Sequence, residues 1–407
     1  MSKRVAVVGG GAAGYFFAVH LVKLVPGVKV IIVEKTSKIL TKLKVSGGGR
    51  CNVTNALNAP NKLAENYPRG KAFLKKVFTK FSSNDTVKWF DHEGVKLKTE
   101  SDNRIFPETD SSQTVIDCFL SLSQKNGVEL KMGAPVEMIS KSEKGLLLNG
   151  SELFDYVFVA SGGSSKIDGY NPLSACGHAI HRPLPSLFTF NIPQNSLKGL
   201  EGVAVASVKI KIEKSTLQSE GAFLVTHWGI SGPAVLKLSA WGAEELAALN
   251  YSFKTYLNFV SAGNSETIRE DILKYKELNK NKLVSGHRLF DLPSRLWERL
   301  CELSLVEQEL KWHEISKLKI NKLVENLSNF QLEVKSKTTF KDEFVTCGGV
   351  SLDDVNNDTM ESLKMPNLYF GGEVLNIDGI TGGFNFQAAW STSWMAAQNV
   401  AEKIKIS

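Results

Sequence analysis

Residues 5–14 read Val-Ala-Val-Val-Gly-Gly-Gly-Ala-Ala-Gly, and this stretch decides the fold. Its four leading apolar residues have the length and composition of a buried parallel strand. Apolar residues then recur at helical spacing as far as Pro26, and a second apolar run over residues 28–33 ends at Glu34. The sequence therefore predicts a strand, a helix and a second parallel strand in succession.

The glycines between the first strand and the helix fit the pattern Gly9-x-Gly11-x-x-Gly14. The first allows a tight turn, the second lets a pyrophosphate approach the backbone, and the third lets the helix pack closely on the strand. The N-terminus of the helix would present free N–H groups to the phosphates. Glu34 would accept hydrogen bonds from ribose hydroxyls, and its charge disfavours the 2′-phosphate of NADP. FAD and NAD remain as the expected dinucleotides.

Later elements favour FAD over NAD. Short strands are predicted at residues 128–132, 136–140, 146–148 and 156–160, and the last of them runs into Ser161-Gly162-Gly163. A meander that returns to such a strand is typical of an FAD domain rather than of a six-stranded dehydrogenase sheet. Near the C-terminus an apolar strand enters Gly371-Gly372-Glu373, which would place an acid against the ribityl and phosphate region.

Composition places the chain among folded proteins. It has 407 residues, enough for two to three domains, and 43% of them are hydrophobic. Five cysteines without a Cys-x-x-Cys spacing exclude a disulfide scaffold and a cysteine-rich zinc module, and the histidines predict no metal site. The apolar stretch over residues 5–22 could pass for a signal or membrane segment, but its glycines and His20 favour a folded strand and helix. A cytoplasmic protein without a membrane partner is expected.

The middle of the chain differs from both ends. Residues 187–192 and 203–212 alternate apolar and polar side chains, as antiparallel strands do, and residues 265–329 follow a helical period. The last segment returns to an apolar strand and a long helix. The simplest architecture is an α/β domain built from both ends of the chain and interrupted by an inserted domain.

Positive charge is concentrated in residues 1–110, which carry 19 Lys and Arg against 9 Asp and Glu. Part of it lies on one short predicted helix, where Lys71, Lys75, Lys76 and Lys80 lie opposite an apolar stripe. An ordinary solvated helix surface is the favoured interpretation. Attraction of an anionic ligand, such as a dinucleotide or RNA, is the alternative.

Residues 44–55, Lys-Val-Ser-Gly-Gly-Gly-Arg-Cys-Asn-Val-Thr-Asn, resemble the signature loop of a bacterial family of FAD-dependent flavoproteins. The family is known as NAD(P)/FAD-dependent oxidoreductase or aminoacetone oxidase-like, and it includes the bile-acid-inducible flavoproteins. Further stretches resemble the family in the same order, namely residues 226–233, 346–350, 371–375 and 381–385. The resemblance therefore spans almost the whole chain, although Asn376 and Ser393 stand where Asp and Gly are more frequent.

The resemblance implies non-covalent FAD and an α/β fold, in which a Rossmann-like FAD-binding domain of the glutathione-reductase type is interrupted by an inserted β-barrel-like and helical domain. The expected boundaries are 1–186 and 344–407 for the FAD domain, 187–264 and 330–343 for the β-rich insert, and 265–329 for its helical subdomain. The residues expected to hold the cofactor are Gly9, Gly11, Ala12, Ala13, Gly14, Glu34, Lys35, Lys42, Ser46, Gly47, Gly48, Gly49, Arg50, Asn52, Asn55, Val136, Ser161, Gly162, Gly163, Gly372, Glu373, Gly382, Gly383, Phe384 and Asn385.

Three residues are candidates for chemistry. Arg50 can supply charge to a phosphate or a substrate carboxylate, or it can form a structural ion pair. Cys51 lies where flavin disulfide reductases carry a redox pair, but no second cysteine is near it, so a packed thiol is favoured. His227 can deliver a proton or serve as a hydrogen-bonded structural residue. Asn52 and Asn55 are expected to bond ring or ribityl oxygens, and the start of the last helix is expected to face the flavin's pyrimidine edge.

The predicted function is that of an FAD-dependent oxidoreductase. Transiently bound NAD(P)H would reduce FAD, and a small organic substrate or oxygen would reoxidise it. A substrate oxidase of amine type, a flavoprotein of RNA modification that uses its basic N-terminal region, and a non-catalytic flavin-binding module remain as alternatives. A nucleic-acid partner is not expected, and the sequence leaves the substrate and the oligomeric state open.

Overall fold

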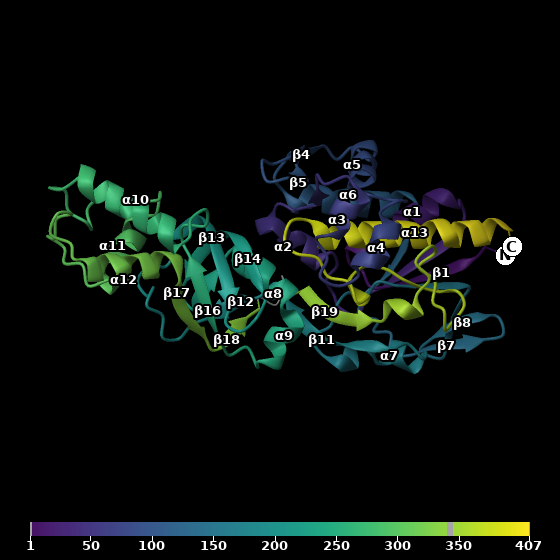
Figure 1. Cartoon of the computed structure of the whole chain (residues 1–407). Helices are drawn as coiled ribbons and strands as arrows, with labels where there is room; N and C mark the ends of the chain where they lie inside the picture. Colours follow the sequence, from purple (N-terminus) through teal and green to yellow (C-terminus); the bar gives the residue numbers. More distant parts are fainter. Residues whose placement is uncertain (1, 340–344, 407) are drawn as a thin grey trace. The chain divides into compact units, whose positions relative to one another are not determined.

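The computed structural model describes residues 2–339 and 345–406, and the chain divides into two compact units (Figure 1). The first unit comprises residues 2–186 and 345–406, and the second comprises residues 187–339. The predicted return from the insert at residues 343–344 lies outside the described residues.

Five parallel strands form the main sheet of the first unit, in the order β20-β10-β1-β2-β6. Val5, Ala6 and Val7 of β1 are fully buried, as expected for a parallel strand that is covered on both faces. The predicted α/β, Rossmann-like fold is therefore confirmed. The strands are β1 (Arg4–Val8), β2 (Lys29–Val33), β6 (Glu129–Lys131), β10 (Tyr156–Val159) and β20 (Leu368–Phe370).

Helices α1 (Ala12–Leu24) and α13 (Phe384–Ile406) pack against one another in this unit (Figure 1). The Ser393 hydroxyl of α13 donates to the carbonyl oxygen of Ala13 at 3.0 Å. The rings of Phe16 and Trp390 lie 5.0 Å apart between their centroids, within a buried aromatic cluster. The C-terminal segment therefore supplies both an edge strand of the sheet and the long helix that packs on α1.

The remaining elements of the first unit are further helices, 3-10 turns and small antiparallel sheets. Its other helices are α2 (Thr41–Gly49), α3 (Pro60–Ala64), α4 (Lys71–Val77), α5 (Ser83–His92), α6 (Ser112–Lys125) and α7 (Asn171–Ala175), with 3-10 turns η1 (Ile167–Tyr170), η2 (Leu352–Asp354) and η3 (Gly372–Val374). Its small antiparallel sheets join β3 (Thr54–Asn55), β5 (Arg104–Pro107) and β4 (Leu97–Thr99), and pair β11 (Ile180–Ser186) with β19 (Val345–Val350).

The meander predicted before β10 is present, but its first strand starts later than predicted. It consists of β7 (Ile139–Ser142), β8 (Gly145–Leu148) and β9 (Glu152–Phe154), paired antiparallel. The prediction that this strand begins at Val136 is wrong. The N–H groups of Glu137 and Met138 donate to the Asn149 side chain at 2.9 and 3.2 Å, so they are not part of the ladder.

The second unit contains a seven-stranded antiparallel sheet, ordered β17-β16-β13-β14-β15-β12-β18. The end strands β17 and β18 share no ladder with each other among the described residues; β17 pairs with β16, and β18 pairs with β12. They are joined by Lys335 alone, which is too short a connection for a hairpin. The strands are β12 (Thr189–Asn191), β13 (Ala204–Ile212), β14 (Gln218–Thr226), β15 (Gly229–Ser231), β16 (Phe253–Asn258), β17 (Phe330–Val334) and β18 (Ser336–Thr338).

Helices of the second unit share one apolar core with the sheet. Trp297 and Trp312 are fully buried in that core, together with Leu300 and Leu323. The stretch predicted as helical contains three separate helices joined by non-helical segments. The helices of the unit are α8 (Pro233–Trp241), α9 (Ala243–Ala248), α10 (Ser265–Leu278), α11 (Ser294–Leu303) and α12 (Lys317–Ser328).

Across residues 2–339 and 345–406, none of the helices combines the length and the apolar character needed to cross a membrane.

Candidate functional site

The turn between β1 and α1 brings backbone groups into close contact. Gly9 has φ +115°, and a Cβ at this position would overlap the carbonyl oxygen of Ala160. A Cβ at Gly14 would overlap the carbonyl oxygen of Gly9. At Gly11, by contrast, nothing lies within 4 Å of where a Cβ would stand. Gly11 is the N-cap of α1 and makes no side-chain cap, so the first N–H groups of the helix are available to an anion beside it.

Glu34 is fixed at the carboxyl end of β2 by three hydrogen bonds. Its Oε2 accepts from the N–H of Gly10 at 2.8 Å. Its Oε1 accepts from the N–H and the hydroxyl of Thr36, each at 2.9 Å. The carboxylate thus lies directly beside the glycine turn, where it can also accept hydrogen bonds from a ribose. Lys35, its predicted neighbour in the site, is exposed.

A second group of predicted residues meets where the C-terminal segment contacts the end of β10. Lys42 Nζ lies 2.5 Å from Glu373 Oε2, and Glu373 Oε1 accepts from the N–H of Thr346 at 2.9 Å. A Cβ at Gly163 would lie 2.8 Å from Glu373 Oε1, and a Cβ at Gly372 would lie 2.9 Å from the Cβ of Ala13. The structure therefore brings these residues close to the start of α1.

Thr346 was not predicted as a site residue, although it lies in one of the stretches that carry the family resemblance. Its hydroxyl oxygen is buried and has no hydrogen-bond partner among the described residues. A Cβ at Gly163 would overlap this hydroxyl. An unpaired buried hydroxyl is costly, so a bound ligand that pairs with Thr346 would remove that cost.

The glycine-rich loop leaves the helical conformation at Ser46. Gly47, Gly48 and Gly49 have φ of 59°, 70° and 84°, and nothing lies within 4 Å of the Cβ positions of Gly48 and Gly49. The loop therefore presents open backbone that a ligand can approach closely. Sequence reasoning missed the helical residues 41–45 of α2, which directly precede this loop.

Asn52 and Asn55 connect this loop to the turn before α13. With its amide oriented to satisfy both partners, Asn52 accepts from the N–H of Gly383 and donates to Thr54 O, each at 3.0 Å. Asn55 Nδ2 donates to Gly382 O at 3.1 Å. Gly383 has φ +90°, and a Cβ there would lie 2.5 Å from Thr54 O. The two asparagines thus hold the turn that positions the start of α13.

The start of α13 is held from two further sides. The Tyr67 hydroxyl donates to Phe384 O at 2.6 Å. The side chain of Asn385 bonds both backbone groups of Gly379, at 2.8 and 2.9 Å. Because the first N–H groups of a helix have no partner within it, this fixed N-terminus can face developing negative charge.

The surroundings of Arg50 and Cys51, two of the candidates for chemistry, differ from those that a reactive side chain would need. Arg50 Nη1 lies 2.6 Å from Glu100 and 3.3 Å from Asp110, and its guanidinium stacks 4.0 Å from the Phe106 ring centre. These contacts match the structural ion pair that was the alternative for this residue. The Cys51 thiol is buried, and burial raises its pKa to about 12. A thiol with that pKa carries almost no thiolate near neutral pH.

Two further predicted residues make none of the contacts given above among the described residues. His227 lies in the second unit, on the exposed turn between β14 and β15. Val136 precedes the meander, two residues after Ala134, whose N–H donates to Glu34 O at 3.0 Å.

One buried ion pair near the site was not predicted. Arg69 donates through Nε and Nη2 to both carboxylate oxygens of Asp378, and the Ser186 hydroxyl donates to Asp378 Oδ2 at 2.6 Å. Asp378 is fully buried and belongs to the segment that leads into the Gly382–Gly383 turn. No local pattern connects residues this far apart in sequence.

These features of the first unit fit FAD. The helix N-terminus can receive the pyrophosphate, and Glu34 can receive a ribose. The open backbone at Gly11, Gly48 and Gly162 leaves room for a ligand, and Thr346 offers an unpaired hydroxyl. We refer to this group of glycines, Glu34, Lys42, Thr346, Glu373 and the start of α13 as the cofactor cradle.

Comparison with known proteins agrees with the Rossmann-like fold of the first unit. A family model described as the HI0933-like protein Rossmann domain matches residues 3–399. The ribosomal RNA dihydrouridine synthase of Escherichia coli (strain K12) is 29% identical over 97% of this chain and 97% of its own length. The 3-dehydro-bile acid delta(4,6)-reductase of Clostridium scindens is 26% identical over 98% of this chain and 99% of its own length.

A solved structure supports the fold. The 3-ketosteroid Δ1-dehydrogenase from Sterolibacterium denitrificans, in complex with 1,4-androstadiene-3,17-dione, superposes with a TM-score of 0.52 and 11% identity, and the match covers 99% of this chain and 100% of that chain.

Proposed function

The chain belongs to the HI0933-like Rossmann family and is an FAD-dependent oxidoreductase, and on this premise we propose that it uses NAD(P)H to saturate a carbon–carbon double bond conjugated with a carbonyl group. Two relatives that align over nearly the whole chain support the proposal. One is named for forming dihydrouridine and the other for reducing delta(4,6) bonds of a 3-dehydro bile acid. Both products carry a carbon–carbon bond that has taken up two hydrogens. This common outcome is the observation that carries the proposal.

The residues of the cradle suit that reaction. The start of α1 and Glu34 would hold the pyrophosphate and the ribose of FAD, and Lys42 and Glu373 would line its ribityl and phosphate region. Bound FAD would supply two-electron transfer between the nicotinamide donor and the double bond. The start of α13 would stabilise negative charge through its free N–H groups. The chain contains a single Gly-x-Gly-x-x-Gly motif, so the nicotinamide donor is proposed to bind transiently.

Uridine in ribosomal RNA is the proposed substrate. The Haemophilus influenzae ribosomal RNA dihydrouridine synthase is also similar, at 27% identity over 98% of this chain. The excess of ten positive charges within residues 1–110 supports a polyanionic partner. Because the bile-acid reductase has nearly the same identity, a conjugated steroid ketone is the second candidate substrate.

Mass spectrometry of ribosomal RNA nucleosides tests the first candidate. Ribosomal RNA from cells that lack the gene should contain less dihydrouridine than RNA from the parent strain, and the purified chain with FAD and NAD(P)H should restore it. A Glu34→Ala variant should restore less, since it loses the bonds to Gly10 and Thr36. If RNA is not modified, anaerobic reoxidation of the reduced enzyme by a 3-keto-4,6-diene steroid tests the second candidate. Failure of both substrates overturns the proposal.

A further inference from the structure

Exposed lysines lie along helix α4 and on the turn that comes after it. Phe73, Leu74 and Val77 of this segment are buried. Opposite them lie the exposed lysines, which we call the lysine face: Lys71, Lys75, Lys76 and Lys80.

The lysine face has no carboxylate partner within the described residues. Elsewhere on the same unit, lysines commonly pair, as Lys62 does with Glu65 at 3.2 Å and Lys96 with Asp91 at 2.6 Å. None of the four ammonium groups of the face lies within 4.0 Å of a described carboxylate oxygen. Like charges four residues apart on a helix cost about 0.2–0.5 kcal/mol per pair. The four lysines therefore do not stabilise the described fold through ion pairs, whereas they would attract an external polyanion.

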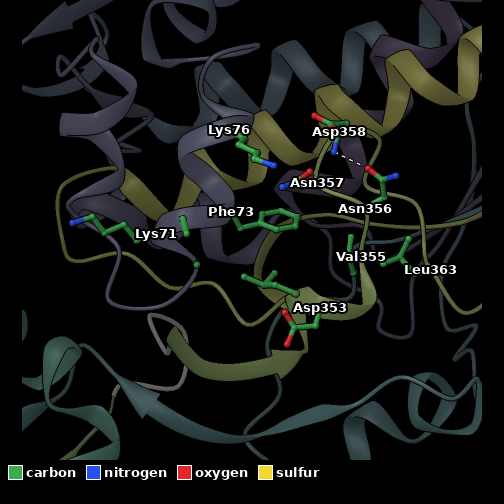
Figure 2. Close-up of a pocket in the computed structure, with 12 residues that line it drawn as sticks. Lys71, Phe73, Lys76, Asp353, Val355, Asn356, Asn357, Asp358 and Leu363 are labelled. Carbon is green, nitrogen blue, oxygen red and sulfur yellow. Dashed lines mark hydrogen bonds between the residues drawn. The ribbon is translucent and has the colours of Figure 1, made fainter.

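A cavity of about 710 Å³ adjoins the lysine face. Figure 2 shows Phe73 and Lys76 projecting from α4 toward the turn that contains Asn357 and Asp358. The volume is in the range of small-molecule pockets, about 300–1,000 Å³. The cavity combines the Phe73 ring, the Asn357 amide, which has no hydrogen bond to the described residues, and Lys76 at its edge. This combination suits a nucleobase attached to a phosphate.

The charges around the cavity define an orientation for such a nucleotide. Asp353 and Asp358 line the side opposite α4 and would repel a phosphate. The phosphates would therefore lie along the lysine face, and the uncharged base would enter the cavity beside Phe73. Carboxylates on the far side can accept hydrogen bonds from base N–H groups.

The lysine face starts next to the segment that leads into the cradle. Arg69 precedes it and pairs with Asp378. A Cβ at Gly70 would lie 2.7 Å from Ile377 Cγ1. The same segment continues to the Gly382–Gly383 turn, so RNA on the lysine face would lie within the unit that holds FAD.

We propose that the lysine face and the adjoining cavity bind single-stranded RNA next to the modified uridine, with the lysines on the phosphates and one unpaired base in the cavity. This inference rests on the proposed RNA substrate and adds the surface that would hold it.

Salt-dependent binding tests the inference. The full chain with FAD is titrated into a fluorescein-labelled oligouridylate at several KCl concentrations, and anisotropy gives the dissociation constant. Each phosphate contact with a single strand contributes about 0.7 to the slope of log K against log salt. A variant with Lys→Gln at all four positions should therefore have a slope that is smaller in magnitude by about 3. Its affinity near 0.1 M salt should fall by about 10²- to 10³-fold.

A matched control separates this effect from a general loss of charge. The control replaces four exposed lysines of the same unit that also lack a described ion pair, namely Lys125, Lys141, Lys144 and Lys405. It should keep an affinity within about threefold of wild type, since its lysines are not in the proposed site. Asn357→Ala should weaken binding about two- to tenfold without changing the slope, because it removes a hydrogen bond and no charge. The melting temperature and flavin absorbance of each variant verify that it is folded.

The outcomes distinguish this inference from the proposed function. If the lysine variant keeps the wild-type slope, or if it matches the control variant, the inference is overturned, even where wild type forms dihydrouridine. If wild type binds the oligouridylate without salt dependence, the inference is likewise overturned. If wild type forms no dihydrouridine in ribosomal RNA, the proposed substrate fails, whatever the variants bind.

Discussion

Lys42 and Glu373 form an ion pair at 2.5 Å, although 331 residues separate them in the chain. The pair connects helix α2 to the 3-10 turn η3 after the last strand of the sheet. Glu373 also holds the N–H of Thr346, whose hydroxyl is unpaired. One carboxylate therefore ties together three segments of the cradle.

Glu373→Gln should weaken FAD binding about fivefold. Glutamine can still accept from the Thr346 N–H, but it loses the charge that holds Lys42. The pair is partly exposed, at 17% for the Glu373 side chain and 40% for Lys42, so about 1 kcal/mol is expected. Quenching of FAD fluorescence during titration of apoprotein measures the effect. Glu65→Gln breaks a fully surface pair and should leave the affinity unchanged. Equal affinities for all three proteins would contradict the role given to Glu373.

Gly383→Ala should disturb the turn before α13 and release FAD. The alanine would have to adopt φ near +90° and would place its Cβ 2.5 Å from Thr54 O. Positive φ alone costs about 1–2 kcal/mol, and the contact adds to it. Thermal unfolding and the flavin content after gel filtration measure both effects. Gly177→Ala is the matched control, because Gly177 has φ +88° with nothing within 4 Å of a Cβ. It should lower the melting temperature less and keep the flavin.

Cys51→Ala should keep the rate of flavin reduction by NAD(P)H within about twofold of wild type. The thiol is buried and its pKa is raised to about 12 by burial, so it offers almost no thiolate for chemistry. Stopped-flow absorbance measures the rate. Iodoacetamide at pH 8 followed by mass spectrometry should leave Cys51 of the native protein unmodified, and denaturation should expose it. Rapid native labelling, or a tenfold loss of rate, would show that the thiol takes part.

Because of His20, the free energy of unfolding of the first unit should be lower in mild acid than at pH 7. Burial lowers the pKa of this histidine from 6.5 to about 4, and its ring bonds Phe16 O and stacks on Trp89. Between these values the unfolded chain takes up a proton that the folded chain does not, so the free energy of unfolding falls as pH falls. The expected loss from pH 7 to pH 5 is about 2 kcal/mol, and it nears about 3 kcal/mol at pH 4.

Urea unfolding at pH 7 and pH 5 compares wild type with His20→Gln. The variant should lose less stability on acidification, by about the amount that His20 contributes. His287 is exposed, so His287→Gln should retain the wild-type difference between the two pH values. A pH dependence shared by all three proteins would contradict the role of His20.

Local patterns predicted the fold well. The strand–helix–strand unit at the N-terminus follows from a short apolar run, a glycine motif and helical periodicity, all within one stretch of sequence. The strand over residues 368–370 and the helix that ends the chain were predicted in the same way. Their partners in space, β10 and α1, follow from the rule that Rossmann sheets are parallel and covered by helices.

Side-chain partners were much harder to predict. Arg50 carries a charge that suits a phosphate, but its partners Glu100 and Asp110 come from segments whose approach no spacing reveals. The Arg69–Asp378 pair and the unpaired hydroxyl of Thr346 depend on the same long-range packing. The start of β7 was misplaced because the Asn149 side chain, rather than a strand, binds the N–H groups of Glu137 and Met138. Sequence patterns thus identify segments, while the folded chain decides which side chains meet.

The edge strand β20 and helix α13 follow the second unit in the chain, so the cradle can close only after the ribosome has synthesised that unit. A nascent polypeptide would display the Gly9–Gly14 turn early but would lack Glu373 and the Gly382–Gly383 turn. Premature termination anywhere before β20 would therefore yield colourless protein, even when everything upstream has been translated faithfully.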